Sequence, residues 1–247
     1  EDLYDTQGEV LWHGNHSLHE VALTFDDGPH PGSCERILNT LKENGIVGTF
    51  FDVGINMRKH PELVRETLAD GNEIGNHSYY HQRLHTLDPR ERHREINDVD
   101  ITYYRITGQH LQLLRPPGMR FNDEVLAMTR SLGYLVVGYD ADSHDFDPKM
   151  KPDEIVDRTL SRTDNGCIIL LHDYLQPSLA LPRIIAALKA RGYRFVTISQ
   201  MVRDLPNPQR AQATQFVARH EAIDRMVARE RAAATAASAQ ATQPVRD

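Results

Sequence analysis

Apolar runs that alternate with amphipathic stretches predict a parallel α/β domain. Short, continuous apolar runs are typical of buried strands, and apolar residues that recur at helical spacing are typical of amphipathic helices. The strand-like runs are 21–25, 47–54, 72–78, 112–117, 134–140, 167–173 and 194–199. The helix-like stretches are 34–45, 61–71, 88–108, 122–133, 152–166 and 179–192. This repeated order predicts parallel strands with helices outside them, an α/β architecture that can close into a barrel.

Residues at the ends of the helix-like stretches support these boundaries. Pro61 lies near the start of one stretch and Gly71 follows its end, which are the positions that proline and glycine favour. Asp88 is a typical N-cap residue, and Pro89 behind it suits the first helical turn. The long stretch 88–108 is therefore predicted to have a well-defined start.

The C-terminal part of the chain differs in composition from the rest. The strand–helix alternation ends near Pro206 and Pro208, and the segment beyond is rich in alanine with a sparse apolar stripe at helical spacing. We expect residues 209–232 to form a helix that docks on the domain or on a partner. We expect the residues after 232 to be frayed or disordered, because they offer little apolar surface to bury.

The overall composition allows a substantial core and excludes some classes of partner. The chain has 247 residues, of which 40% are hydrophobic, and a formal net charge of -7. This charge argues against nucleic acid as the main partner, because phosphate binding needs a basic surface. No apolar stretch approaches the roughly 18 to 20 residues that a membrane-spanning helix needs. Residue 1 is acidic and no leader pattern follows it, so we expect a processed or trimmed chain.

The two cysteines do not identify a cellular compartment. Cys167 lies in an apolar run, where cysteine often serves as a small hydrophobic residue. Whether it pairs with Cys34 stays open at this stage.

Charged and imidazole side chains follow several of the strand-like runs. They are Asp26, Asp27, His77, His81, Arg115, Asp140, Asp142, Asp145, His172 and Asp173. Taken singly, each is more often a turn, surface or hydrogen-bonded residue than part of a site. The pair His77 and His81 would share one face if it lay on a helical turn. Because the C-terminal ends of parallel strands meet at one end of the domain, the concentration of such residues there favours a functional site.

These residue types suit metal-assisted hydrolysis. One Asp and two His provide three ligands for a zinc-like cation and leave a position for water and substrate. A second carboxylate beside that water can act as a general base. A His on the opposite wall can protonate the leaving group while the metal polarises the carbonyl oxygen. The sequence therefore predicts hydrolysis of an amide or an ester.

Five short motifs, in order along the chain, resemble the polysaccharide deacetylase family, also known as the NodB-homology domain and carbohydrate esterase family 4. They are TFDDGP at 24–29, HSYYH at 77–81, RPPG at 115–118, DSHDF at 142–146 and LLHD at 170–173. The resemblance covers roughly residues 19–205. It implies a distorted (β/α) barrel with fewer than eight full repeats. The chain then divides into an N-terminal extension (1–18), the barrel (19–205) and an alanine-rich helical tail (206–247).

The resemblance also implies a metal site and a base. Asp27, His77 and His81 would bind one divalent metal ion, most commonly Zn²⁺, with Co²⁺, Ni²⁺ and Fe²⁺ as alternatives. Asp26 would be the general base that deprotonates the metal-bound water, and Arg115 would hold Asp26 ionised and oriented.

By the same resemblance, the remaining motif residues would provide the general acid and the contacts to the substrate. His172 would be the general acid, tuned by Asp145, and Leu170 would help to line the acetyl pocket. The substrate residues of the third and fourth motifs would be Pro117, Gly118 and Phe146. Gly118 stands where the family usually has an aromatic residue, and Phe146 stands in place of the usual Trp. These departures affect substrate contacts and leave the metal and acid–base residues intact.

By this resemblance, the expected activity is removal of N-acetyl groups from a polysaccharide that contains N-acetylglucosamine, such as peptidoglycan or chitin-type oligomers. The alternatives are an O-acetyl esterase on acetylxylan or another acetylated glycan, and a small-molecule amidase or deformylase. An inactive carbohydrate-binding module is a further alternative that the intact acid, base and metal residues disfavour. The expected partner is an acetylated glycan, and the family's substrates imply an extracellular, periplasmic or cell-wall location.

Overall fold

A computed structural model describes residues 10–206 of the chain. The predicted helix at 209–232 and its docking lie outside the described residues, as do the first nine residues of the predicted N-terminal extension. None of the helices in the described range is long and apolar enough to cross a membrane.

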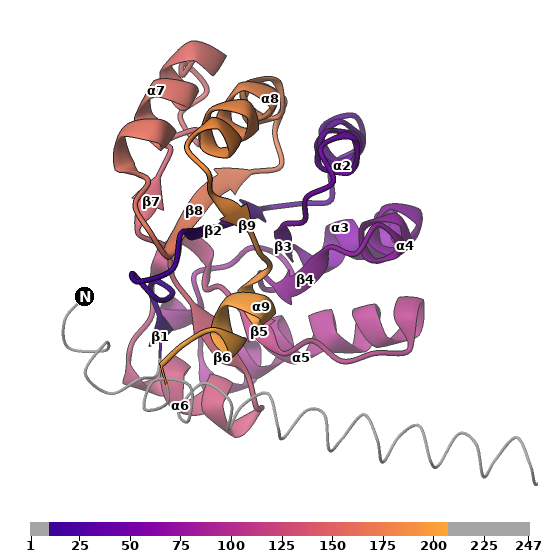
Figure 1. Ribbon diagram of the computed structural model, residues 1–247. Helices are drawn as coiled ribbons and strands as arrows, with labels where there is room; N and C mark the ends of the chain where they lie inside the picture. Colours follow the sequence, from indigo (N-terminus) through magenta and orange to yellow (C-terminus); the bar gives the residue numbers. More distant parts are fainter. Residues whose placement is uncertain (1–9, 207–247) are drawn as a thin grey trace, which may run out of the picture.

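The strands form one curled, entirely parallel sheet, and the predicted α/β barrel-like architecture is confirmed (Figure 1). The sheet order is β1-β6-β5-β4-β3-β2-β8-β7, and β9 pairs with β2 beyond this path. The strand bounds are β1 Val10–Leu11, β2 Glu20–Asp26, β3 Thr49–Asp52, β4 Glu73–Asn76, β5 Leu113–Leu114, β6 Leu135–Val137, β7 Ala141–Asp142, β8 Cys167–His172 and β9 Arg194–Phe195. Within residues 10–206 no pairing joins β1 to β7, so the barrel is open between these strands.

Helices surround the strands, as the alternation predicts (Figure 1). Their bounds are α2 Ser33–Glu43, α3 Gly54–Lys59, α4 Pro61–Ala69, α5 Pro89–Thr107, α6 Asp123–Ser131, α7 Pro152–Arg162, α8 Leu175–Ala190 and α9 Ile198–Arg203, with 3-10 turns η1 Leu84–Thr86 and η2 Pro117–Met119. The predicted start of α5 is confirmed, because the Asp88 side chain accepts hydrogen bonds from the N–H groups of Arg90 and Glu91. Helix α8 begins four residues earlier than the pattern predicts.

The last predicted strand, 194–199, is wrong over most of its length. Only Arg194 and Phe195 pair with β2, after which Thr197 caps α9 by accepting a hydrogen bond from the N–H of Gln200. Ile198, which the pattern assigns to the strand, begins α9 instead, and this helix packs against apolar residues of the sheet. A short apolar run does not distinguish a strand from a buried helix, which explains the error.

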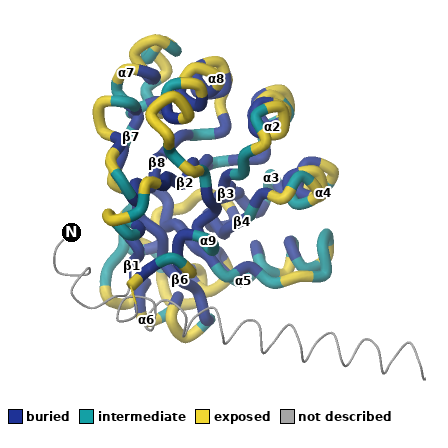
Figure 2. The backbone as a smooth tube through the Cα atoms, in the orientation of Figure 1, coloured by how far each residue is buried: buried dark blue, intermediate teal, exposed yellow. Residues whose placement is uncertain are grey.

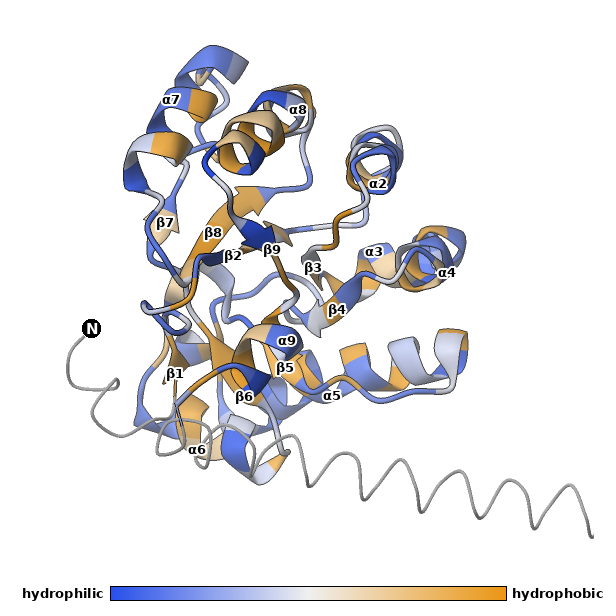
Figure 3. Cartoon of the chain, viewed as in Figure 1, coloured by the Kyte–Doolittle hydropathy of each residue, from blue (hydrophilic) through white to orange (hydrophobic). Residues whose placement is uncertain are grey.

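The central strands are buried on both faces, which fits a parallel sheet covered by helices (Figure 2). All residues of β2 are buried, and residues 167–171 of β8 form a continuous apolar run (Figure 3). Alternate residues of β2 face different surroundings, since Leu23 packs in the larger apolar cluster and Ala22 in the smaller one. The strand register aligns Asp26 at the end of β2 with His172 at the end of β8. Packing of the sheet therefore fixes two polar residues side by side at the C-terminal rim.

Candidate active site

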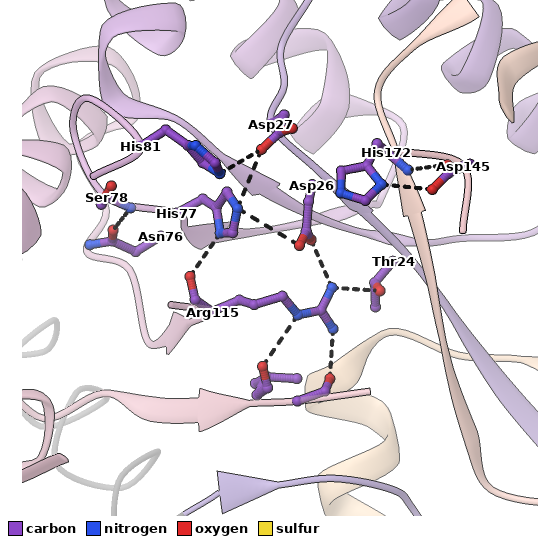
Figure 4. A network of polar contacts seen from close by, with 12 residues as sticks. Thr24, Asp26, Asp27, Asn76, His77, Ser78, His81, Arg115, Asp145 and His172 are labelled. Carbon is purple, nitrogen blue, oxygen red and sulfur yellow. Dashed lines mark hydrogen bonds and ion pairs between the residues drawn. The ribbon is translucent and has the colours of Figure 1, made fainter. Parts of the chain in front are cut away.

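Asp26 is paired with Arg115, a buried arginine that directly follows the C-terminal end of β5 (Figure 4). The Nη1 atom of Arg115 donates to Asp26 Oδ1 at 2.7 Å and to Thr24 Oγ1 at 2.8 Å. Its Nε and Nη2 atoms donate to the carbonyl oxygens of Val137 and Gly138 at 3.2 and 2.7 Å. Arg115 is 0% exposed, and its positive charge offsets the burial of the Asp26 carboxylate.

Asp27, His77 and His81 converge from two loops, as predicted for a metal site. One potential ligand atom from each residue lies within 4.8 Å of the other two. The Oδ1 atom of Asp27 lies 3.4 Å from His77 Nε2 and 3.1 Å from His81 Nε2. The second carboxylate, Asp26, directs its Oδ2 atom toward the same cluster, 3.8 Å from His77 Nε2.

The hydrogen bonds of His77 show that this cluster fits a cation. Its Nδ1 atom lies 2.7 Å from the carbonyl oxygen of Arg115, which can only accept, so Nδ1 carries the proton. In the neutral ring, Nε2 then offers a lone pair toward Asp27, whose Oδ1 is itself a buried acceptor without a hydrogen-bond donor. Histidine metal ligands commonly donate their other ring N–H to a carbonyl oxygen, which fixes the tautomer of the ring. Acceptor atoms that converge in this way are satisfied by a positive ion.

His77 and His81 reach the cluster by a different route from the one that their spacing indicates. They do not lie on a helical turn, because the chain from Ser78 to His81 forms a loop in which both of these residues have a positive φ, 61° and 57°. Asn76 supports the start of this loop, since its Oδ1 accepts from the N–H of Ser78 and its Nδ2 donates to the carbonyl of Ile96. The structure brings the predicted residues together, but the helical turn that their spacing suggested is wrong.

His172 and Asp145 form a close pair on the other side of Asp26 (Figure 4). His172 Nδ1 lies 2.7 Å from Asp145 Oδ1, and the backbone N–H of His172 donates to Asp145 Oδ2 at 2.7 Å. The Asp145 side chain is fully buried. Burial by itself lowers the pKa of His172, but the hydrogen bond and the charge of Asp145 outweigh burial and raise that pKa to about 9. The ring is therefore protonated at neutral pH.

The carboxyl of Asp27 is ionised for a related reason. Burial by itself raises its pKa, but the adjacent imidazoles of His77 and His81 and the hydroxyl of Tyr174 together outweigh burial and hold the pKa below its ordinary value. The adjacent carboxylate of Asp27 in turn raises the pKa of His81. Protons and a cation therefore compete for the same imidazole, which makes cation binding weaker at low pH.

The predicted substrate residues lie at different depths. Gly118 is exposed with φ 62°, and the neighbouring N–H of Met119 already donates to the carbonyl of Pro116 at 2.8 Å. Phe146 is 52% exposed, and its ring centroid lies 6.2 Å from that of His172. Leu170 and Pro117 are buried. Of the four residues that the sequence predicts, only Gly118 and Phe146 offer an exposed surface to a ligand.

The structure adds a residue that the sequence analysis does not single out. Tyr174 follows the LLHD motif directly, and its hydroxyl contacts Asp27. The one feature of the sequence that could have pointed to Tyr174 as a site residue is its position immediately after the motif. The two cysteines are both free and buried, so the structure contains no Cys34–Cys167 disulfide.

The fold and the site together define an open parallel (β/α) barrel with a cluster of one Asp and two His on its C-terminal rim that could hold a metal ion. Residues 13–137 match the family model described as polysaccharide deacetylase. The chain is 33% identical over 203 residues to a peptidoglycan-N-acetylglucosamine deacetylase of Bacillus cereus, covering 79% of this chain and 94% of that protein. This chain belongs to the polysaccharide deacetylase family.

Two further comparisons involve peptidoglycan-N-acetylmuramic acid deacetylase PdaC of Bacillus subtilis. The chain is 37% identical to it over 182 residues, which is 73% of this chain and 38% of the PdaC sequence. It therefore spans well under half the length of that relative. The solved structure of peptidoglycan deacetylase PdaC from the same organism superposes with a TM-score of 0.71 at 36% identity, covering 76% of this chain and 91% of that one.

Proposed function

We propose that this chain is a metal-dependent deacetylase that hydrolyses N-acetyl groups of a glycan containing N-acetylglucosamine, with peptidoglycan as the leading substrate. The observation that carries the proposal is the convergence of a three-ligand cluster, a buried Asp26–Arg115 pair and a His172–Asp145 pair on one rim of the barrel. The names of the relatives, which specify peptidoglycan amino sugars, support the choice of substrate. A substrate of this kind implies action at the cell wall.

The cluster of Asp27, His77 and His81 would hold the cation. Two imidazoles and one carboxylate form the donor set that zinc accepts in catalytic sites, and Co²⁺, Ni²⁺ and Fe²⁺ accept the same donors. When bound, the cation supplies a positive charge that polarises the scissile carbonyl oxygen.

Asp26 is the proposed general base. Its Oδ1 atom is occupied by Arg115, whereas Oδ2 faces the ligand cluster and is free to take the proton of an attacking water. The guanidinium keeps the carboxylate oriented while the proton arrives. The N–H of Gly118, an exposed residue, is the proposed donor to the oxyanion that forms on the carbonyl.

His172 is the proposed general acid. Its Nδ1 atom is paired with Asp145, so Nε2 carries the proton that passes to the leaving nitrogen as the C–N bond breaks. A pKa of about 9 keeps this proton in place at neutral pH. An amide needs this proton because an amine anion is a poor leaving group. Phe146 beside the ring is the proposed apolar wall for the sugar.

Acetate release tests the proposal. Zinc-reconstituted protein is incubated with peptidoglycan, N-acetylglucosamine oligomers and acetylxylan, each with and without a chelator. We expect chelator-sensitive acetate release from the amino-sugar substrates, restored by added zinc. Release from acetylxylan alone would replace the amide assignment with an ester one. No release from any substrate, with zinc bound at one ion per chain, would refute the proposed activity.

A further inference from the structure

The two oxygens of the Asp27 carboxylate have different partners. Oδ1 is the atom that faces the imidazoles of His77 and His81, at 3.4 and 3.1 Å. Oδ2 accepts a hydrogen bond of 2.5 Å from the hydroxyl of Tyr174, which lies 147 residues further along the chain. One oxygen is therefore available to a cation while the other is held by the protein.

The ring of Tyr174 is positioned by contacts that do not involve its hydroxyl. Its centroid lies 5.7 Å from that of His172 with the two planes 4° apart, and 5.5 Å from that of His30 at 30°. Its backbone N–H donates to the carbonyl of His172, and the residue is the N-cap of α8. A phenylalanine at this position would keep the stacking and the backbone contacts, and would lose the hydrogen bond to Asp27 alone.

Asp27 needs such an anchor because its backbone conformation is unusual. Its φ is 75°, in the left-handed region, and its carbonyl is held by Asn56 Nδ2 at 2.9 Å. These contacts fix the backbone but leave the torsion of the carboxylate to its side-chain partners. A carboxylate that rotates freely can offer either oxygen or both to a cation, and each loss of orientation weakens a metal site. Asp26 is anchored in a similar way, since Arg115 holds its Oδ1 and leaves Oδ2 toward the cluster.

We propose that Tyr174 is a positioning residue whose hydroxyl holds Asp27 in a one-oxygen ligand geometry and thereby sets the affinity of the site for a divalent cation. The inference rests on the proposed function, because it assumes that the cluster holds a metal ion. It goes further by assigning a role to a residue outside the ligand set. Tyr174 acts through Asp27 and need not touch the substrate.

A metal-binding measurement tests this role without an activity assay. The metal-free parent and Tyr174→Phe are titrated with Zn²⁺ in competition with a chelator of known affinity, and with Co²⁺ followed by its visible absorption spectrum. We expect Tyr174→Phe to bind Zn²⁺ about 10- to 100-fold more weakly, the usual cost of losing a hydrogen-bond partner of a metal ligand. We also expect its Co²⁺ spectrum to change, because the coordination of Asp27 changes.

Tyr193→Phe is the matched control. Tyr193 packs edge-on against His19 beside β9, remote from the rim, so the same loss of a hydroxyl there should leave Zn²⁺ affinity unchanged. The melting temperature of each metal-free variant separates positioning from folding. We expect metal-free Tyr174→Phe to have the same melting temperature as the metal-free parent.

Two results would overturn the inference and leave the proposed function standing. The first is equal Zn²⁺ affinity and an unchanged Co²⁺ spectrum in Tyr174→Phe and parent. The second is a weaker affinity accompanied by a large fall in the melting temperature of the metal-free protein, which would make the hydroxyl a general structural contact. Failure of the parent itself to bind either metal would overturn the proposed function and this inference together.

Discussion

Replacing Asp145 with Asn should lower the pH above which the deacetylation rate declines. Asp145 accepts two hydrogen bonds from His172, one from the ring and one from the backbone N–H, each at 2.7 Å. Asn keeps the shape of the side chain but offers one acceptor and one donor group in place of two acceptors. One of the two hydrogen bonds is therefore lost, together with the negative charge that favours the protonated ring.

The size of the effect follows from the pKa of His172. That pKa is raised from 6.5 to about 9 although burial opposes the change, which corresponds to about 3 kcal/mol in favour of the charged ring at 1.36 kcal/mol per pKa unit. Asp26 and Asp27 also raise this pKa, but in the proposed metal-bound enzyme both would face the cation. Without the charge of Asp145, the pKa should fall to about 6.5 or below. At pH 7.5 the protonated fraction then drops from nearly all to about a tenth or less.

The assay is the pH dependence of kcat for an N-acetylated oligosaccharide. The acid form of His172 is present below its pKa and is lost as pH rises through it, so the parent should hold its rate up to about pH 9. The Asp145→Asn variant should decline from about pH 6.5 upward. An aryl acetate, whose leaving group needs no proton, serves as the control and should be much less affected. If kcat of the variant for the N-acetylated oligosaccharide still declined only near pH 9, Asp145 would not be what keeps His172 protonated.

Three further changes test other parts of the site. Asp26→Asn should lower kcat by about 10² to 10⁴-fold with metal content unchanged, and near-normal turnover would remove Asp26 as the base. His77→Ala should lose bound zinc by elemental analysis; a metal content equal to the parent's would contradict its assignment as a ligand. Gly28→Ala should cost about 1–3 kcal/mol in the free energy of unfolding by denaturant titration. An added Cβ there would lie 2.7 Å from Asp173 Oδ2 and 2.8 Å from Asp52 Oδ1, so an unchanged midpoint would show that this region can relax.

The sequence by itself determined most of the local structure. The strand–helix alternation and the Asp88 N-cap were predictable because period, capping and turn signals act between residues close together in the chain. The positions of Asp26, Asp27 and His172 at strand ends followed from the same signals. The strand predicted at 194–199 failed because a short apolar run fits a buried helix equally well.

Only the tertiary structure decided how the site residues meet. The spacing of His77 and His81 indicated a helical face, yet a loop with positive φ brings them to Asp27. The motifs indicated that Arg115 serves Asp26, but not that its carbonyl also fixes the tautomer of His77. The contact between Tyr174 and Asp27 joins residues 147 positions apart. Such contacts depend on strand register and helix packing across the whole barrel, and no local pattern of residues encodes them.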